Sequence, residues 1–139
     1  FYPSDNPRGG RQGRDDNMGK TVVLVEDEPN IIEAISFILS RDGWGVHTHS
    51  NGDTALAALE SKAPDLIVLD VMLPGRSGFD ILRDIRSHKT LGETPVMMLT
   101  ARGQTKDRER AMELGASLFM TKPFSNSDVL AAVRELAGA

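Results

Sequence analysis

Short apolar runs alternate with longer amphipathic stretches along the chain from Met18 onward. The short runs predict β-strands, and in the longer stretches apolar residues recur at i, i+3 and i+4, which predicts helices. The strands are expected at residues 21–26, 44–49, 65–70, 94–100 and 117–122. The helices are expected around these apolar sets: Ile31, Ile35 and Ile38; Ala55, Leu56 and Leu59; Phe79, Leu82 and Ile85; Ala111, Met112 and Leu114; Val129, Val133 and Leu136.

The ends of the predicted helices carry residues that favour helix starts and stops. Pro29 suits a first helical turn, and Gly43 and Gly115 suit the exits from two other helices. The sequences SGFD and SNSD predict capping boxes that begin at Ser77 and Ser125. The boundaries therefore agree with the periodicity.

The first and third predicted strands, TVVLVE and DLIVLD, are almost continuously hydrophobic. Such runs are typical of parallel strands whose two faces are both covered by helices. Five strand and helix units in alternation predict a doubly wound α/β fold. The expected sheet has five parallel strands in the flavodoxin-like order 2-1-3-4-5.

Composition narrows the functional classes. With 139 residues, 40% of them hydrophobic, one domain over residues 18–139 is expected. The net charge of -4 gives no general attraction to nucleic acid or to an anionic membrane. Because the chain has no cysteine, disulfides, thiol nucleophiles and cysteine metal sites are excluded, and a cytoplasmic location is expected. No apolar run is long enough to predict a membrane span.

Residues 1–17, FYPSDNPRGGRQGRDDN, show neither helical nor strand periodicity. Their content of Gly, Pro, Asp, Asn and Arg predicts a disordered arm, either a native extension or a remnant of a cloning vector. The basic stretch RGGRQGR lies next to Asp15 and Asp16, which favours a solvated tail over a nucleic-acid contact.

Reactive side chains stand at the carboxyl ends of four of the five predicted strands. The first strand ends in Glu26 and Asp27, the third in Asp70, the fourth in Thr100 and the fifth in Lys122. Ligands bind at the carboxyl ends of the strands in this type of fold, near the point where the strand order reverses. We therefore expect three carboxylates, a hydroxyl and an ammonium group in one crevice.

Three carboxylates at close range repel one another, so each resists ionisation unless a cation is supplied. Hard oxygen ligands with room for water suit Mg²⁺. In such a site Asp70 can act as a nucleophile toward a phosphoryl group and form an acyl phosphate. Lys122 can stabilise the developing charge, and Thr100 can donate a hydrogen bond to the same group.

The motifs VEDEP, LDVMLPGRSG, LTA and TKPF, in this order and spacing, resemble those of CheY-like receiver domains of bacterial two-component response regulators. The resemblance covers residues 19 to 137. It implies a phosphoacceptor at Asp70 and a metal held by Glu26, Asp27, Asp70 and the backbone carbonyl of Met72. It further implies phosphoryl contacts from Thr100 and Lys122, a small neighbour at Ala101, a switch aromatic at Phe119 and a cis bond before Pro123.

The resemblance also implies a function and partners. A histidine kinase or a histidine phosphotransfer protein would phosphorylate Asp70 with Mg²⁺ bound, and Mn²⁺ would substitute for it. The change of conformation would control an output partner or an effector domain absent from this chain. The resemblance implies no enzyme beyond self-phosphorylation and dephosphorylation, no nucleotide cofactor, no direct binding to nucleic acid or membrane, and a monomer or weak dimer.

Three features depart from the family pattern. Glu26 replaces the more frequent aspartate, and its extra methylene would place it on the metal through water. Phe119 stands where tyrosine is common, so no hydroxyl secures either rotamer. The sequence GASLF lacks an acidic pair found in receivers that dimerise through the fourth helix, fifth strand and fifth helix, which argues against that dimer.

Two other functions fit parts of the pattern. A phosphatase of the haloacid dehalogenase type would need a second aspartate two residues after Asp70, where this chain has Met72. A docking module or mononucleotide binder would not need the acidic set, and the first loop lacks a phosphate cradle. His47 and His49 lack a third ligand and are expected to face solvent, and His88 is expected to lack a partner.

Overall fold

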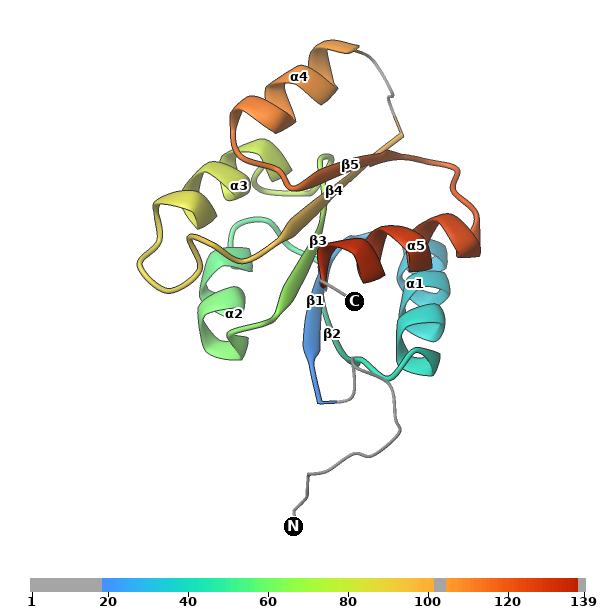
Figure 1. Ribbon diagram of the computed structural model, residues 1–139. Coiled ribbons are helices and arrows are strands. Elements are labelled where there is room, and N and C mark those ends of the chain that lie inside the picture. The colour runs from blue at the N-terminus through green and yellow to red at the C-terminus, as the bar shows by residue number, and fades with distance from the viewer. Residues whose placement is uncertain (1–18, 102–104, 138–139) are drawn as a thin grey trace.

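The computed structural model describes residues 19–101 and 105–137. A parallel sheet of five strands, in the order β2-β1-β3-β4-β5, lies between two layers of helices (Figure 1). This arrangement confirms the predicted doubly wound fold and strand order. The predicted arm, residues 1–17, lies outside the described residues.

Strands and helices alternate strictly along the chain. Each strand begins and ends within two residues of its predicted limits. The strands are β1 (Thr21–Val25), β2 (Gly45–His49), β3 (Leu66–Asp70), β4 (Val96–Thr100) and β5 (Leu118–Thr121). The helices are α1 (Pro29–Arg41), α2 (Ala55–Lys62), α3 (Gly78–Ser87), α4 (Thr105–Glu113) and α5 (Asn126–Leu136).

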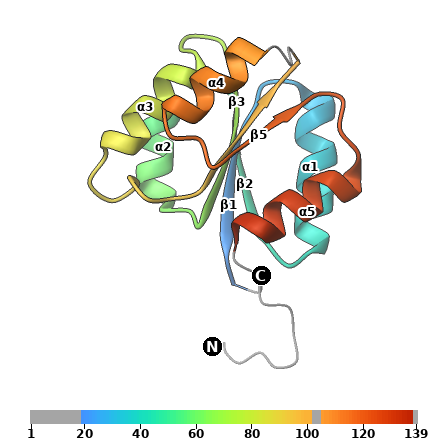
Figure 2. The same ribbon diagram turned by 45° about the horizontal axis from the view of Figure 1, so that its top comes forward.

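Each face of the sheet packs against its own set of helices. α1 and α5 cover one face, and α2, α3 and α4 cover the other (Figure 2). The side chains of β1, β3 and β4 alternate between the two cores, and every residue of β3 and β4 is buried. Burial on both faces explains why these strands are continuous hydrophobic runs.

The predicted helix boundaries have the expected geometry. Pro29 is in the first turn of α1. The hydroxyl oxygens of Ser77 and Ser125 accept hydrogen bonds from the backbone N–H groups of the third helical residues of α3 and α5. Gly43 and Gly115 have φ values of +97° and +103°, in the left-handed region that glycine adopts without a steric penalty.

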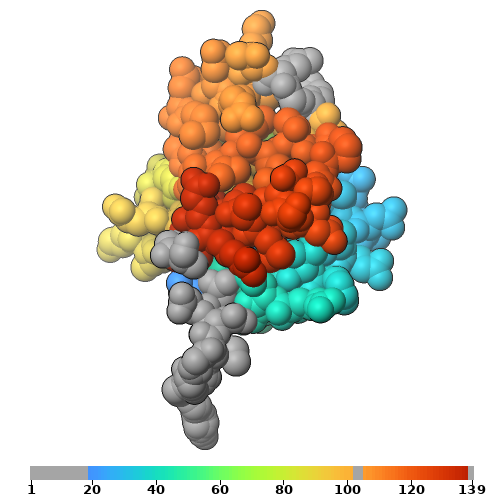
Figure 3. Space-filling view, turned by 45° about the vertical axis from the view of Figure 1, so that its right-hand side comes forward, coloured from blue at the N-terminus to red at the C-terminus, as the bar shows by residue number. Residues whose placement is uncertain are grey.

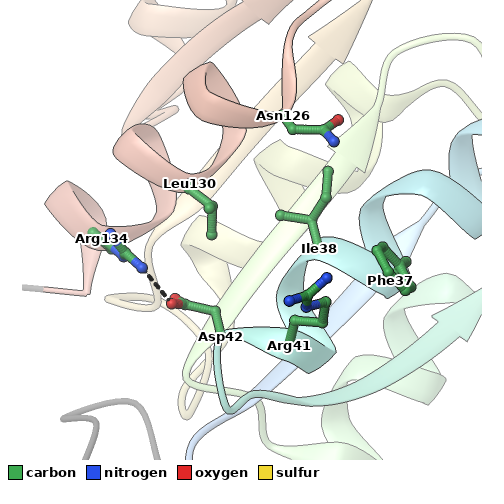
Figure 4. A pocket seen from close by; sticks show the side chains of 7 residues that line it. All are labelled: Phe37, Ile38, Arg41, Asp42, Asn126, Leu130 and Arg134. Atoms are coloured by element: carbon green, nitrogen blue, oxygen red, sulfur yellow. Dashed lines mark hydrogen bonds and ion pairs between the residues drawn. The ribbon is translucent and has the colours of Figure 1, made fainter.

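α1 and α5 lie side by side on their face of the sheet, and α5 occupies the middle of the surface shown in Figure 3. A guanidinium nitrogen of Arg134 on α5 lies 2.6 Å from a carboxylate oxygen of Asp42 at the end of α1. These two residues border a cavity between the helices (Figure 4), which is also lined by Phe37, Ile38, Arg41, Asn126 and Leu130. The ion pair ties the two helices of this layer together.

None of the helices in the two described ranges combines the length and the apolar character that crossing a bilayer requires.

The expectation that His88 lacks a partner was wrong, because its Nε2 atom lies 2.7 Å from a carboxylate oxygen of Glu60. The two residues are 28 positions apart, and the contact forms only once α2 and α3 pack together.

Arg86, near the end of α3, joins two loops through its guanidinium group. Its Nε donates to the carbonyl of Gly115 at 2.8 Å, and its Nη1 donates to the carbonyls of Thr94 at 2.7 Å and Gly92 at 3.2 Å. The planar guanidinium carries five donors in a fixed geometry, which a lysine cannot reproduce. Arg86 therefore holds the turns that precede β4 and β5.

We expect Arg86→Met to lower the free energy of unfolding by about 2–4 kcal/mol, because the mutation leaves three carbonyl groups without their donor. Arg83→Met is the matched control on the same helix, since Arg83 is exposed and its guanidinium lies 3.7 Å from the carboxylate of Asp80. Its expected effect is below about 0.5 kcal/mol. Urea denaturation measures both; equal effects would contradict the structural role of Arg86.

Candidate functional site

The sheet register brings the predicted site residues together. β1 and β3 are adjacent, with Val25 opposite Leu69, so Glu26 and Asp70 emerge side by side at the carboxyl edge. β4 and β5 are the next pair, with Thr100 opposite Thr121, which places Lys122 beside the end of β4. The four strands β1, β3, β4 and β5 therefore contribute to one site, as predicted.

Three carboxylates form the centre of this site. Oxygen atoms of Glu26, Asp27 and Asp70 all lie within 4.8 Å of one another. Glu26 and Asp70 are buried, with 0% and 2% of their surface exposed, whereas Asp27 is exposed to solvent. A cluster that is buried on one side and open on the other suits a hard cation that keeps part of its water shell.

Backbone groups orient the two buried carboxylates. One oxygen of Glu26 accepts hydrogen bonds from the N–H groups of Asp27 and Glu28, both at 3.1 Å. Oδ1 of Asp70 accepts a hydrogen bond from the N–H of Met72 at 3.3 Å. These bonds fix the carboxylates before any ligand binds.

Lys122 supplies a positive charge within the acidic cluster. Its Nζ atom lies 3.0 Å from an oxygen of Glu26, 3.1 Å from one of Glu28 and 3.4 Å from Oδ1 of Asp70. The side chain is only 10% exposed. The peptide bond between Lys122 and Pro123 is cis.

The environment of Asp70 opposes its ionisation. Burial, followed by the charge of Glu26, raises the pKa of Asp70 to about 7, although Lys122 and the Met72 N–H act in the opposite direction. Burial lowers the pKa of Lys122, but Glu26, Glu28 and Asp70 together raise it above its usual value. Lys122 therefore stays charged, and the charge of Asp70 depends on how many cations the site holds.

Thr100 and Phe119 occupy the predicted positions on β4 and β5. Thr100 is completely buried at the end of its strand, and Phe119 is 4% exposed. The guanidinium carbon of Arg108, on α4, lies 5.2 Å from the centre of the Phe119 ring. Phe119 is thus in an inward position, held between the core and a cation–π contact.

Met72 lies at the mouth of the site. Its side chain is 59% exposed, and together with Asp27 and residues 71 and 73–77 it lines a shallow cavity beside the carboxylates. The cavity lies at the carboxyl end of β3, where Val71 follows Asp70. The roles of the Met72 carbonyl as a metal ligand and of Ala101 as a small neighbour stay predictions.

The contact between Glu28 and Lys122 was not predicted from the sequence. Glu28 occupies the cap position of α1, next to Pro29. Its side chain makes no capping hydrogen bond and contacts Lys122 instead. The two residues are 94 positions apart, and the only signal in the sequence was a third acid in the run EDE.

A family model described as the response regulator receiver domain matches residues 22–134. The chain belongs to this family. It is therefore a receiver domain of the two-component signalling systems, in which such domains act between histidine kinases and an output. The resemblance of the four motifs predicted this family.

Curated relatives include longer response regulators. The chain is 41% identical to the alkaline phosphatase synthesis transcriptional regulatory protein PhoP of Bacillus subtilis over 86% of its own length and 49% of that protein. It is 40% identical to the probable transcriptional regulatory protein TcrX of Mycobacterium tuberculosis over 88% of its length and 52% of that protein. The receiver domain described here thus spans about half the length of these relatives.

Solved structures of receiver domains share the fold. The BeF3-activated N-terminal receiver domain of Klebsiella pneumoniae RstA has a TM-score of 0.80 and 29% identity, over 86% of this chain and 99% of that one. The receiver domain of sensor histidine kinase PA1611 from Pseudomonas aeruginosa, with a magnesium ion in its active site cleft, has a TM-score of 0.80 and 28% identity, over 87% and 99%. The acidic cluster of this receiver is consistent with a divalent metal site.

Proposed function

We propose that Asp70 is the phosphoacceptor of this receiver domain. One observation carries the proposal: within the described residues, only Glu26, Asp27 and Asp70 form a cluster able to hold a cation, and Lys122 contacts this cluster directly. Asp70 lies at the carboxyl edge of the sheet beside the shallow cavity, where a donor can approach it.

The donor that fits this role is the phosphohistidine of a histidine kinase or of a histidine phosphotransfer protein. An oxygen of Asp70 bonds to phosphorus while the bond between phosphorus and the imidazole nitrogen breaks, and the nitrogen keeps the electron pair. The products are an acyl phosphate on Asp70 and a free histidine. Lys122 stabilises the charge on the phosphoryl oxygens, and Thr100 donates a hydrogen bond to one of them.

Glu26, Asp27 and Asp70, with the carbonyl of Met72, would hold Mg²⁺, and Mn²⁺ would substitute. When bound, the ion neutralises charge on the carboxylates and on the phosphoryl oxygens. Asp70 needs this neutralisation of its charge. When Lys122 is its sole cationic neighbour, the pKa of Asp70 is raised to about 7, so the carboxyl group is only partly ionised at neutral pH.

The output of this reaction is a change of conformation. Thr100 moving toward the phosphoryl group would leave space for Phe119 to reorient, and the surface formed by α4, β5 and α5 would change. The phosphoryl group is transferred to the domain's own Asp70, so we infer a signalling module and not an enzyme acting on external substrates. We infer a cytoplasmic protein, a monomer or weak dimer, that controls an output partner or an attached effector domain and binds neither nucleic acid nor membrane itself.

The residues of this site do not fit the two competing functions. A phosphatase of the haloacid dehalogenase type needs a proton donor two residues after the nucleophile, and the exposed thioether of Met72 cannot donate a proton. A pure docking module would have no need to bury Glu26 and Asp70 together, since burial of two like charges is unfavourable.

Incubation with Mg²⁺ and acetyl phosphate tests the proposal. We expect one phosphoryl adduct per chain, seen by intact-protein mass spectrometry and removed by hydroxylamine, which cleaves acyl phosphates. Asp70→Asn and a chelator should each abolish it, and Asp80→Asn, a change on the neighbouring helix, should not. Rapid turnover of phosphate esters would support the phosphatase instead, and the absence of any adduct would support a docking module.

A further inference from the structure

Lys122 is held by three carboxylates that differ in their burial. The side chains of Glu26 and Asp70 are 0% and 3% exposed, whereas that of Glu28 is 59% exposed. Glu28 is therefore the outermost of the three partners and lies at the rim of the site. Its distance to Nζ, 3.1 Å, is shorter than the 3.4 Å distance from Nζ to Asp70.

The three carboxylates surround the ammonium group: Nζ donates hydrogen bonds to Glu28 and Asp70 and lies 3.0 Å from an oxygen of Glu26. A phosphoryl oxygen on Asp70 would compete with these carboxylates for the same cation, so the contact that is weakened at the lowest cost gives way first. Glu26 is completely buried and cannot exchange its cation for water at low cost. Water can replace the contact with Glu28, because this carboxylate is exposed.

The position of Glu28 is not explained by helix capping. It occupies the cap position of α1, where a short polar side chain usually accepts a backbone hydrogen bond, but its carboxylate makes no such bond. The side chain instead reaches across to the loop after β5 and contacts Lys122.

We propose that Glu28 is a positioning residue that competes with the phosphoryl group for Lys122. In the unphosphorylated domain Glu28 draws the ammonium toward the rim and partly neutralises it. When Asp70 carries a phosphoryl group, Lys122 leaves Glu28 and donates to a phosphoryl oxygen. This inference rests on the proposed function, since it requires that Asp70 is the phosphoacceptor.

Two variants separate the charge of Glu28 from its reach. Glu28→Gln removes the charge, and Glu28→Asp keeps the charge but is one methylene too short for the contact with Lys122. The matched control is Glu33→Gln, which removes an exposed charge from α1 at a residue that is not one of the three carboxylates in contact with Lys122. Thermal unfolding of each variant shows whether the fold is unchanged.

The measurement is the affinity for BeF₃⁻, a stable mimic of the phosphoryl group, at saturating Mg²⁺. Both Glu28 variants should bind it about two- to fivefold more tightly than the wild type, the range expected when an exposed ion pair no longer competes. The side-chain amine resonance of Lys122 in the ligand-free protein should shift in both variants and not in Glu33→Gln.

Equal or weaker BeF₃⁻ binding by the two Glu28 variants would overturn the proposed role of Glu28 and leave the phosphoacceptor site intact. Tighter binding by Glu28→Gln alone would also overturn it, because the effect would then come from net charge and not from the contact. If the wild-type protein bound no BeF₃⁻ at all, the proposed function itself would fail, and with it the role of Glu28.

Discussion

Replacing Asp70 by asparagine is expected to stabilise the metal-free protein, by an amount that grows as the pH rises. The cause is the buried carboxyl group, whose pKa is raised from 3.8 to about 7 by burial and by the nearby charge of Glu26. Asparagine has nearly the same shape and carries no charge at any pH. The substitution therefore removes the ionisation that the folded protein opposes.

The sign follows from proton binding. Between the pKa of 3.8 in the unfolded chain and about 7 in the folded protein, the folded state keeps a proton that the unfolded state releases. Stability therefore falls as the pH rises through this range. The full difference in the free energy of unfolding between Asp70→Asn and the wild type is about 4 kcal/mol. It is reached above about pH 7, and most of it is absent below about pH 4.

Urea denaturation in the presence of a chelator, from about pH 4 to about pH 8, measures this effect. The difference in unfolding free energy between Asp70→Asn and the wild type should increase across the range, while that of the control Glu33→Gln should stay constant. Mg²⁺ should stabilise the wild type more than Asp70→Asn, because it binds the ionised carboxylate. A difference that does not change with pH would contradict the raised pKa.

Lys122→Met should have the second large effect. The mutation removes the cation that contacts Glu26, Glu28 and Asp70. Glu26 and Asp70 then stay buried without a cationic partner from Lys122. Removal of one partner from a buried ion pair destabilises a protein by about 3–5 kcal/mol. We expect a loss of this size at about pH 8 without metal, and a partial recovery with Mg²⁺.

The same variant should also slow phosphorylation. Loss of a single group that stabilises transition-state charge lowers a rate by about 10²- to 10³-fold, so formation of the adduct from acetyl phosphate should slow by that factor. Lys89→Met is the matched control, because Lys89 is exposed and lies in the turn after α3. If Lys122→Met and Lys89→Met behaved alike in both assays, Lys122 would have neither role.

The fold could be predicted from the sequence because each level of the pattern agrees with the others. The buried strands β1 and β3 have no alternative to a sheet covered on both faces, and Pro29, Ser77 and Gly115 mark helix boundaries by local chemistry. The site could be predicted for the same reason. Once the strand order is known, Glu26, Asp70 and Lys122 must meet at the carboxyl edge.

The contacts that were missed involve long side chains that reach between elements. The pairs formed by Glu28 with Lys122 and by His88 with Glu60 depend on rotamers and on how the helices pack, which periodicity does not determine. The inward position of Phe119 under Arg108 is of the same kind, because the ring could have pointed either way.

The central claim is that Asp70, among the clustered acids, carries the phosphoryl group. Borohydride reduction after treatment with Mg²⁺ and acetyl phosphate tests it most directly, because it converts an aspartyl phosphate to homoserine, which peptide mass spectrometry locates. The account predicts homoserine at position 70 and unmodified acids at Glu26, Asp27 and Glu28. Modification at any of those three positions, with residue 70 still aspartate, would contradict it.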